Sequence, residues 1–202
     1  KFITGNKKVF FNDVQIKGLI NLIIISIIFM FIYLQISNND NLFNNLRIAT
    51  FNVVSILSGT GYVTSDFGVW GKFSIIFFIF LMFVGGCAGS TTCGIKIFRL
   101  QILILFVTKQ IKQLIYSKGI FKINYNKENI SDQFISSVIA FIFLYFLIFF
   151  LVSLLLSLTG LDLLTAISAA ATCISNVGPG LGETIGPNGN FSEISDTAKW
   201  IL

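Results

Sequence analysis

The chain has 202 residues, a formal net charge of +5 and no histidine; 54% of its residues are hydrophobic and 11% are charged. A soluble globular domain carries roughly 25% charged residues, so this chain lacks the polar surface that a water-soluble particle of its size needs. The absence of histidine excludes histidine-based catalysis and histidine metal ligands. The composition therefore predicts an integral membrane protein.

Three segments contain no charged residue: 18–36, 73–95 and 133–161. A helix needs about 20 mostly apolar residues to cross a bilayer, and each segment reaches or nearly reaches that length. Buried core helices of a large soluble protein are the alternative, but three such runs in one short chain argue against it. We expect each of these segments to lie in the membrane.

The basic residues gather before the first apolar run and between the second and the third. They are Lys1, Lys7, Lys8 and Lys17 in the first group, and Lys96, Arg99, Lys109, Lys112, Lys118, Lys122 and Lys127 in the second. Cytoplasmic loops of membrane proteins carry such an excess, so both groups are predicted to lie in the cytoplasm. The positive charge thus indicates orientation, and we expect no nucleic-acid partner.

Between the first two long runs lies a short apolar segment, residues 48–57. A stretch of about 10 to 14 residues is too short to span and is more often re-entrant. If it crossed together with 73–95, the basic segment 96–127 would lie outside. Residues 48–57 are therefore predicted to enter the membrane from outside and to return.

The second half of the chain repeats this plan at an offset of 117 residues. The repeat unit is a span, a short re-entrant helix, a glycine-centred loop and a second span, and internal repeats of this kind are common in transport proteins. The offset aligns Leu46–Tyr62 with Leu163–Pro179, and so Ala49 with Ala166, Leu57 with Ile174, Ser58 with Ser175, and Gly61 with Gly178.

Each re-entrant helix is followed by a segment that is predicted to bind a cation. The first partly matches the Thr-Val-Gly-Tyr-Gly filter of potassium channels, in which backbone carbonyls replace the water shell of the ion, and glycine permits the backbone conformations required. No Asp or Glu lies between residues 48 and 64 or between 163 and 182, so backbone carbonyls are the proposed ligands. An ordinary extracellular loop is the alternative. The filter segments are Ser58, Gly59, Thr60, Gly61 and Tyr62, and Ser175, Asn176, Val177, Gly178 and Pro179.

The apolar run 73–95 contains four glycines in ten residues. Glycine weakens a helix by roughly 1 kcal/mol relative to alanine, so the span is predicted to break in mid-membrane. A phosphate-binding loop is disfavoured because the Gly-Lys-Ser/Thr ending is missing, whereas close helix packing remains an alternative. The functional hypothesis is a flexible loop that obstructs the path beneath the filter. It comprises Gly85, Gly86, Cys87, Ala88, Gly89, Ser90, Thr91, Thr92, Cys93 and Gly94.

Five runs together resemble the TrkH/TrkG potassium-uptake subunits of bacteria, relatives of KtrB and of the plant HKT transporters. The runs are Phe51–Ser55, Thr60–Tyr62, Phe83–Thr91, Gly94–Lys96 and Asn176–Gly182. The resemblance implies an all-α integral membrane fold, in which units of membrane helix, re-entrant pore helix and membrane helix surround a pseudo-fourfold pore. It also implies the filter role of residues 58–62 and 175–179 and the gating role of residues 85–94.

The same resemblance implies how the chain divides. Residues 1–108 would be the third repeat with a broken second helix, 109–131 a cytoplasmic linker, and 132–202 the fourth repeat, truncated before its last helix is complete. The first two repeats would precede this chain in a longer protein. The family further implies a homodimer in the lipid of the bacterial inner membrane and a cytosolic TrkA-like nucleotide-binding regulatory subunit. Potassium would be the transported ion, with no bound cofactor.

We therefore expect potassium uptake through a carbonyl-lined filter, with no bond-making chemistry. A membrane-embedded enzyme would need paired ionisable residues at membrane depth, and the sequence has none. A non-conducting structural subunit of a membrane complex and a sodium-permeable member of the same family are the alternatives. The sequence leaves open potassium selectivity over sodium, passive or coupled transport, and the identity of the regulatory nucleotide.

Overall fold

The computed structural model describes residues 13–37, 41–119, 121–126 and 128–202; the basic residues Lys1, Lys7, Lys8 and Lys127 lie outside this part of the chain. The helices are α2 (Val14–Ser37), α3 (Leu42–Ser58), α4 (Lys72–Met82), α5 (Ile97–Ile115), α6 (Asp132–Leu158), α7 (Leu163–Ser175) and α8 (Asp196–Ile201). Four two-residue strands accompany them: β1 (Val84–Gly85), β2 (Ile95–Lys96), β3 (Asn124–Tyr125) and β4 (Glu128–Asn129).

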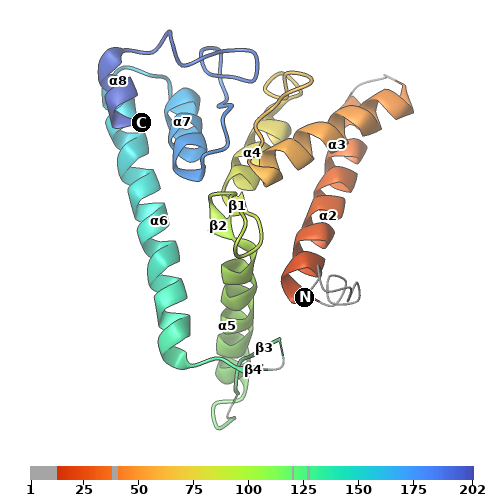
Figure 1. The fold of residues 1–202 in the computed structure, drawn as a ribbon, viewed down its shortest axis with the longest axis vertical. Helices are drawn as coiled ribbons and strands as arrows, with labels where there is room; N and C mark the ends of the chain where they lie inside the picture. The colour runs from red at the N-terminus through yellow and green to blue at the C-terminus, as the bar shows by residue number, and fades with distance from the viewer. Residues whose placement is uncertain (1–12, 38–40, 120, 127) are drawn as a thin grey trace.

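The long helices follow the long axis of the molecule, and the short ones lie near one end of it. In Figure 1, α2, the α4–α5 pair and α6 run along this axis, while α3 and α7 occupy the upper part and the linker between α5 and α6 lies at the bottom. Helix α3 packs against α2, and α7 packs against α6. Both halves of the chain therefore place one short helix beside one long helix.

Two helices in the described part of the chain, α2 and α6, are long and apolar enough to cross a membrane. At 1.5 Å per residue both exceed the roughly 30 Å of a bilayer's hydrocarbon core. Only 17% of the most apolar stretch of α2 and 11% of that of α6 is buried. A core helix of a soluble protein would be mostly buried, so these exposed faces fit a lipid environment, as Phe29, Phe143 and Phe150 illustrate.

The second span of the first half is broken where the four glycines predict it. Helix α4 ends at Met82 and α5 begins at Ile97, and between them β1 and β2 pair in parallel, with Val84 opposite Ile95. A Cβ at Gly85 would overlap the carbonyl oxygen of Cys93. Glycine at position 85 therefore lets the two ends of the loop approach closely enough to pair.

Helix α5 continues to Ile115, so residues 109–115, the first part of the predicted linker, are helical. Beyond it, the Tyr125 hydroxyl donates to Gln101 Oε1 over 2.7 Å, and Gln101 Nε2 donates to the Val14 carbonyl over 3.0 Å. Burial raises the pKa of Tyr125, which keeps the phenol protonated as a donor at neutral pH. These bonds attach the linker to α5 and to the start of α2.

Two hydrophobic cores lie around the short helices α3 and α7. The first contains Phe67 and Phe78, fully buried and stacked with their ring centroids 4.2 Å apart, and extends to Ala171 of α7. In the second, other alanines of α7 pack against Leu156 of α6 and Ile194 near α8. Phe149 packs against both cores and thereby joins them.

Candidate functional site

The first predicted filter segment begins where α3 ends. Gly59 takes a left-handed conformation with φ 67°, and the Thr60 amide donates to the Ser55 carbonyl over 3.0 Å. The Ser55 hydroxyl donates to the Tyr62 carbonyl over 2.6 Å. These bonds turn the chain sharply out of the helix and hold residues 60–62 against its last turn. Non-helical backbone of this kind is tolerated at membrane depth only where protein buries it or it lines a watery cavity.

A buried asparagine of α3 fixes the chain beyond this segment. Asn52 is fully buried; its Nδ2 donates to Thr64 Oγ1 over 3.1 Å and to the Ile48 carbonyl over 2.9 Å, and its Oδ1 accepts from the Thr64 amide over 3.3 Å. The amide side chain therefore links α3 to the chain that follows the first predicted filter segment. A buried polar group that is satisfied in this way favours one local geometry.

The second predicted filter segment repeats the backbone bonds of the first at the offset of 117. The Asn176 amide donates to the Cys173 carbonyl over 3.2 Å, as the Gly59 amide does to Ile56 over 3.1 Å. The Val177 amide donates to the Thr172 carbonyl over 3.0 Å, the counterpart of the bond from Thr60 to Ser55. Asn176 has φ 50°, in the left-handed region where asparagine is among the few tolerated residues.

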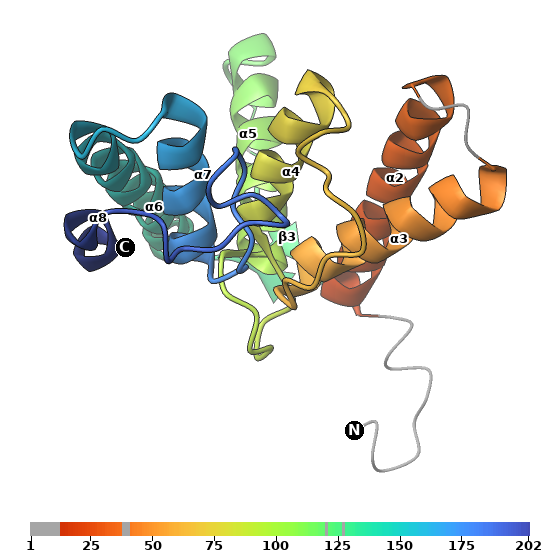
Figure 2. The ribbon, with the colours of Figure 1, turned by 90° about the horizontal axis from the view of Figure 1, so that it is seen from above.

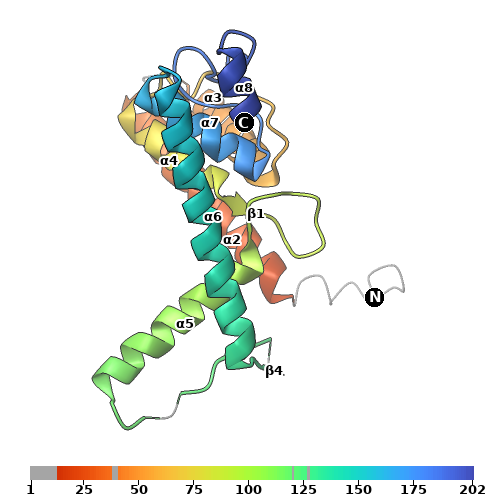
Figure 3. The same cartoon turned by 90° about the vertical axis from the view of Figure 1, so that its left-hand side faces the viewer.

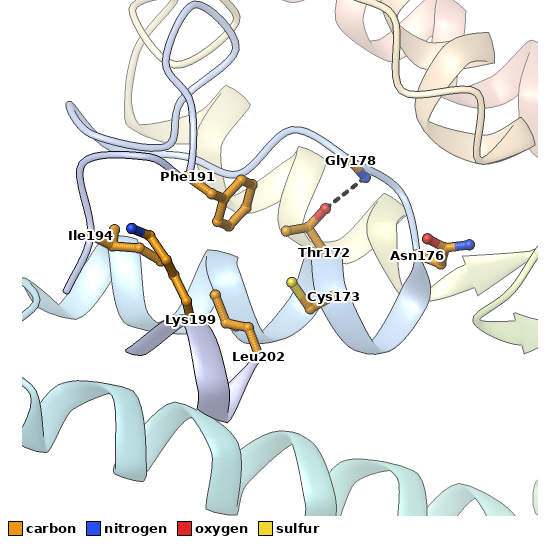
Figure 4. Close-up of a pocket in the computed structure, with 8 residues that line it drawn as sticks. All are labelled: Thr172, Cys173, Asn176, Gly178, Phe191, Ile194, Lys199 and Leu202. Atoms are coloured by element: carbon orange, nitrogen blue, oxygen red, sulfur yellow. Dashed lines mark hydrogen bonds between the residues drawn. The ribbon is translucent and has the colours of Figure 1, made fainter. Parts of the chain in front are cut away.

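Side chains of α6 and α7 support the second segment. Thr172 Oγ1 accepts from the Gly178 amide over 2.9 Å, as the dashed line in Figure 4 marks. Ser168 exchanges hydrogen bonds of 2.9 Å with the amide and the carbonyl of Leu181. The Ser175 hydroxyl lies 2.6 Å from the Tyr145 hydroxyl of α6. The Ser175 side chain thus anchors the segment to α6.

The two predicted filter segments lie in contact with each other. A Cβ at Gly61, which has φ 75°, would overlap the carbonyl oxygen of Val177 and lie 3.3 Å from Pro179 Cδ. A Cβ at Gly178, which has φ 116°, would lie 3.6 Å from the Gly61 Cα. Two glycines that are far apart in the sequence therefore allow the two backbones to approach closely. This contact is the central feature of the site.

A cavity of about 400 Å³ lies over this contact, and the loop that follows the second segment forms its far wall. Figure 2 shows the loop from above, between α7 and the chain that follows α3. The residues of the described chain that line the cavity are uncharged: Gly61, Tyr62, Val63, Gly178, Pro179, Ile185, Gly186, Pro187, Gly189, Asn190 and Phe191. An adjoining cavity of about 630 Å³ includes the carboxylates Asp66, Glu183 and Glu193.

A third cavity, of about 320 Å³, borders the second segment on the side of α8. Figure 4 shows Asn176 and Gly178 at one side of it and Phe191, Ile194 and Lys199 at the other. Lys199 pairs with Asp196 over 3.1 Å on the same helix. The second segment is thus flanked by open space on this side and by α6 on the other.

The glycine-rich loop reaches both filter segments. A Cβ at Gly59 would lie 3.8 Å from both the Asn176 carbonyl oxygen and Thr92 Cγ2, and Asn176 Nδ2 lies 3.9 Å from Cys93 Sγ. The contacts fall at the ends of α3 and α7, on the side away from the 400 Å³ cavity. The end of the loop therefore contacts both predicted filter segments.

Hydrogen bonds within the loop and to α2 define its shape. Thr92 Oγ1 accepts from the Gly86 amide over 2.8 Å and lies 2.7 Å from Ser90 Oγ. The Ala88 amide donates to Gln15 Oε1 of α2 over 2.9 Å. Figure 3 shows the loop projecting from the β1–β2 pair. The loop is therefore held at both of its ends and at its tip.

Four side chains that shape the site have no role in the prediction from sequence: Asn52, Ser55, Ser168 and Thr172. Lys96 is given only the role of a cytoplasmic basic residue. The four form polar pairs at spacings of three residues in α3 and four in α7, which lie on one helix face. That pattern, just before a glycine-centred loop, is the signal that predicts support of the loop.

Comparison with known proteins identifies the family of the chain. Residues 17–201 match the family model of TrkH, which is described as a cation transport protein. The chain belongs to the TrkH family. The Trk system potassium uptake protein TrkI of Halomonas elongata is 44% identical over 202 residues, which are 100% of this chain and 41% of that protein. TrkH of Vibrio parahaemolyticus is 34% identical over 76% of this chain and 31% of its own length.

The crystal structure of the potassium transporter TrkH from Vibrio parahaemolyticus superimposes on this TrkH-family chain with a TM-score of 0.91 at 31% identity. The match covers 100% of this chain and 43% of that one, so the chain spans less than half of the length of the relatives it matches. The expected helical membrane-transporter fold is confirmed. The TrkH family is a family of transporters and not of enzymes.

Proposed function

We propose that the protein containing this chain takes up potassium across the plasma membrane. Residues 58–62 and 175–179 supply two segments of its selectivity filter, and residues 85–94 form its intramembrane gate. The observation that carries the proposal is the contact of Gly61 with Val177 and Gly178, because it juxtaposes two non-helical, carbonyl-bearing segments. The names of the relatives, potassium uptake proteins, support the choice of ion.

The chemistry of the two segments suits a weakly hydrated monovalent cation. Carbonyl oxygens can replace a water shell and still let the ion leave, which a ring of carboxylates would resist. Helices α3 and α7 both end at these segments, and the C-terminal end of a helix carries a partial negative charge. Both helices therefore favour a cation beside Gly59 and Asn176.

The 630 Å³ cavity, which we call the outer cavity, adds a long-range electrostatic attraction for cations. Three carboxylates, those of Asp66, Glu183 and Glu193, line it, and a cleft with charge of one sign raises the local concentration of counter-ions. The basic α5 and linker region lies at the opposite end of the molecule (Figure 1). This polarity supports an orientation with the outer cavity outside the cell and the linker in the cytoplasm.

The remaining assignments extend the proposal to the whole protein. We assign residues 1–108 to the third repeat of a four-repeat pore, 109–131 to a cytoplasmic linker and 132–202 to the fourth repeat. The protein would be a homodimer in the bacterial inner membrane, and the cytoplasmic face would dock a TrkA-like nucleotide-binding subunit. The basic residues Lys109, Lys112 and Lys118 of α5 and the following turn lie on that face.

The experiment that tests the proposed function is cation uptake by the full-length protein in bacteria that lack their own potassium uptake systems. Rubidium should enter at a rate well above that of cells with the empty vector, and external potassium should compete with it more strongly than sodium does. Equal competition by sodium would favour the sodium-permeable alternative. Uptake at the background rate, with normal amounts of the protein in the membrane, would favour a non-conducting subunit.

A further inference from the structure

The Lys96 side chain is bound to the glycine-rich loop by oxygen atoms alone. Its Nζ donates to the Ser90 carbonyl over 2.7 Å, to Ser90 Oγ over 3.2 Å and to the Thr92 carbonyl. The ion pairs among the described residues join other groups, Lys109 with Asp132 and Lys199 with Asp196. The Lys96 charge is therefore stabilised by carbonyl and hydroxyl dipoles and not by a carboxylate.

This ligand set resembles the one that a potassium filter provides. An ammonium is a compact unit charge with three donors, and backbone carbonyls are the ligands that replace the hydration shell of potassium. Two loop carbonyls and one hydroxyl converge on the ammonium here. The oxygens that solvate a tethered ammonium can equally solvate a free monovalent cation.

The position of the oxygens links them to the filter. Thr92 supplies one of the carbonyls, and its methyl group is within 3.8 Å of the position a Cβ would take at Gly59. Lys96 itself belongs to β2 and precedes α5, and its partner in β1 is Gly85. The ammonium thus ties Ser90 and Thr92 of the loop to the β1–β2 pair at its base.

We propose that the oxygens of Ser90 and Thr92 form a second monovalent-cation site on the loop side of the filter, filled by the Lys96 ammonium while the loop is closed. A potassium ion that leaves the filter competes with the ammonium for these oxygens. Exchange of one cation for the other frees the loop from α5 and couples ion arrival to opening. This inference rests on the proposed gate and filter.

The test follows the chemical accessibility of Cys93, which is exposed and lies next to Asn176. Full-length protein in liposomes is treated with an uncharged methanethiosulfonate, because a charged reagent would itself respond to the loss of a lysine. Modification is followed by mass spectrometry of the Cys93 peptide. In N-methylglucamine, whose cation is too large for the site, Cys93 of K96M should react about tenfold faster than Cys93 of the wild type. A change of this size is expected when the closed state of the loop loses most of its excess population over the open state.

Potassium then tests the site directly. Replacing N-methylglucamine by potassium should speed the modification of wild-type Cys93 toward the K96M rate, because the ion displaces the ammonium and frees the loop. K96R, which keeps a tethered cation, should respond like the wild type. The same exchange should change the rate of K96M by less than about twofold, since no tethered cation is left to displace. Lys96→Gln keeps a donor without charge and should lie between the wild type and K96M.

Two results would overturn the proposal: equal Cys93 rates in K96M and the wild type, or a potassium effect in K96M as large as that in the wild type, which would report filter occupancy. Lys122→Met, at an exposed lysine of the linker, is the matched control for loss of a lysine and should leave the Cys93 rate unchanged. An acceleration by K122M as large as that by K96M would also contradict the proposal. Because no transport is measured, failure of rubidium uptake would contradict the proposed function without touching this result.

Discussion

Replacing Gly61 with alanine is expected to lower rubidium uptake by the full-length protein by about a hundredfold, the effect of roughly 3 kcal/mol on a rate. Two costs combine at this position. Gly61 has φ 75°, and a side chain in the left-handed region costs roughly 1–2 kcal/mol. The added Cβ would also overlap the carbonyl oxygen of Val177, so one or both filter segments must move. Gly61→Ser should act in the same direction.

Gly160→Ala is the matched control for this prediction. Gly160 lies in the turn between α6 and α7 with φ 88°, and a Cβ there would meet nothing within 4 Å. It carries a similar backbone cost without the overlap and should keep uptake close to the wild-type rate. Equal losses in the two variants would show that backbone strain alone is responsible. Normal uptake by a well-inserted Gly61→Ala protein would contradict the filter assignment.

Removal of residues 87–91 is expected to raise cation flux several-fold. The deletion joins Gly86 to Thr92 and keeps the β1–β2 pair, but it removes the tip of the loop, including the bond from the Ala88 amide to Gln15. It also removes Ser90, one of the two residues that bind Lys96. Allosteric couplings of about 1–3 kcal/mol correspond to roughly 5–150-fold changes, and the loss of the loop's attachments falls in this range. Rubidium efflux from liposomes containing the full-length protein measures the change.

The control for the deletion shortens a loop at the cytoplasmic end. Removal of residues 117–119, which follow α5, should leave the flux unchanged because this turn lies far from the filter (Figure 1). A fall in flux after removal of residues 87–91, with normal amounts of protein in the membrane, would instead indicate that the glycine-rich loop serves packing.

Much of the fold follows from the sequence because lipid imposes simple requirements. Absence of charge over a sufficient length predicts α2 and α6, and four glycines predict the break between α4 and α5. The start of α3 was harder to predict from the sequence. The apolar run begins at Ile48, whereas the helix begins at Leu42 and its first turns include Asn44, Asn45 and Arg47. Polar residues of this kind are tolerated at a helix end because such an end need not be apolar throughout.

The site was predictable only in part. The offset of 117 aligned Gly61 with Gly178, and the structure brings these two glycines together. The polar supports could not be placed in the same way. Whether Asn52 bonds to Thr64, or Lys96 to Ser90, depends on how the intervening loop folds back on itself, and hydropathy carries no information on that geometry.

The central claim is that peptide oxygens of residues 58–62 and 175–179 together bind the transported ion. The most direct measurement is a structure of the full-length protein grown with thallium or rubidium, whose anomalous scattering locates each ion. The account predicts an anomalous peak in contact with carbonyl oxygens of both segments, between the 400 Å³ cavity and the glycine-rich loop. Anomalous peaks elsewhere in the protein, with none in contact with carbonyl oxygens of residues 58–62 or 175–179, would contradict the claim.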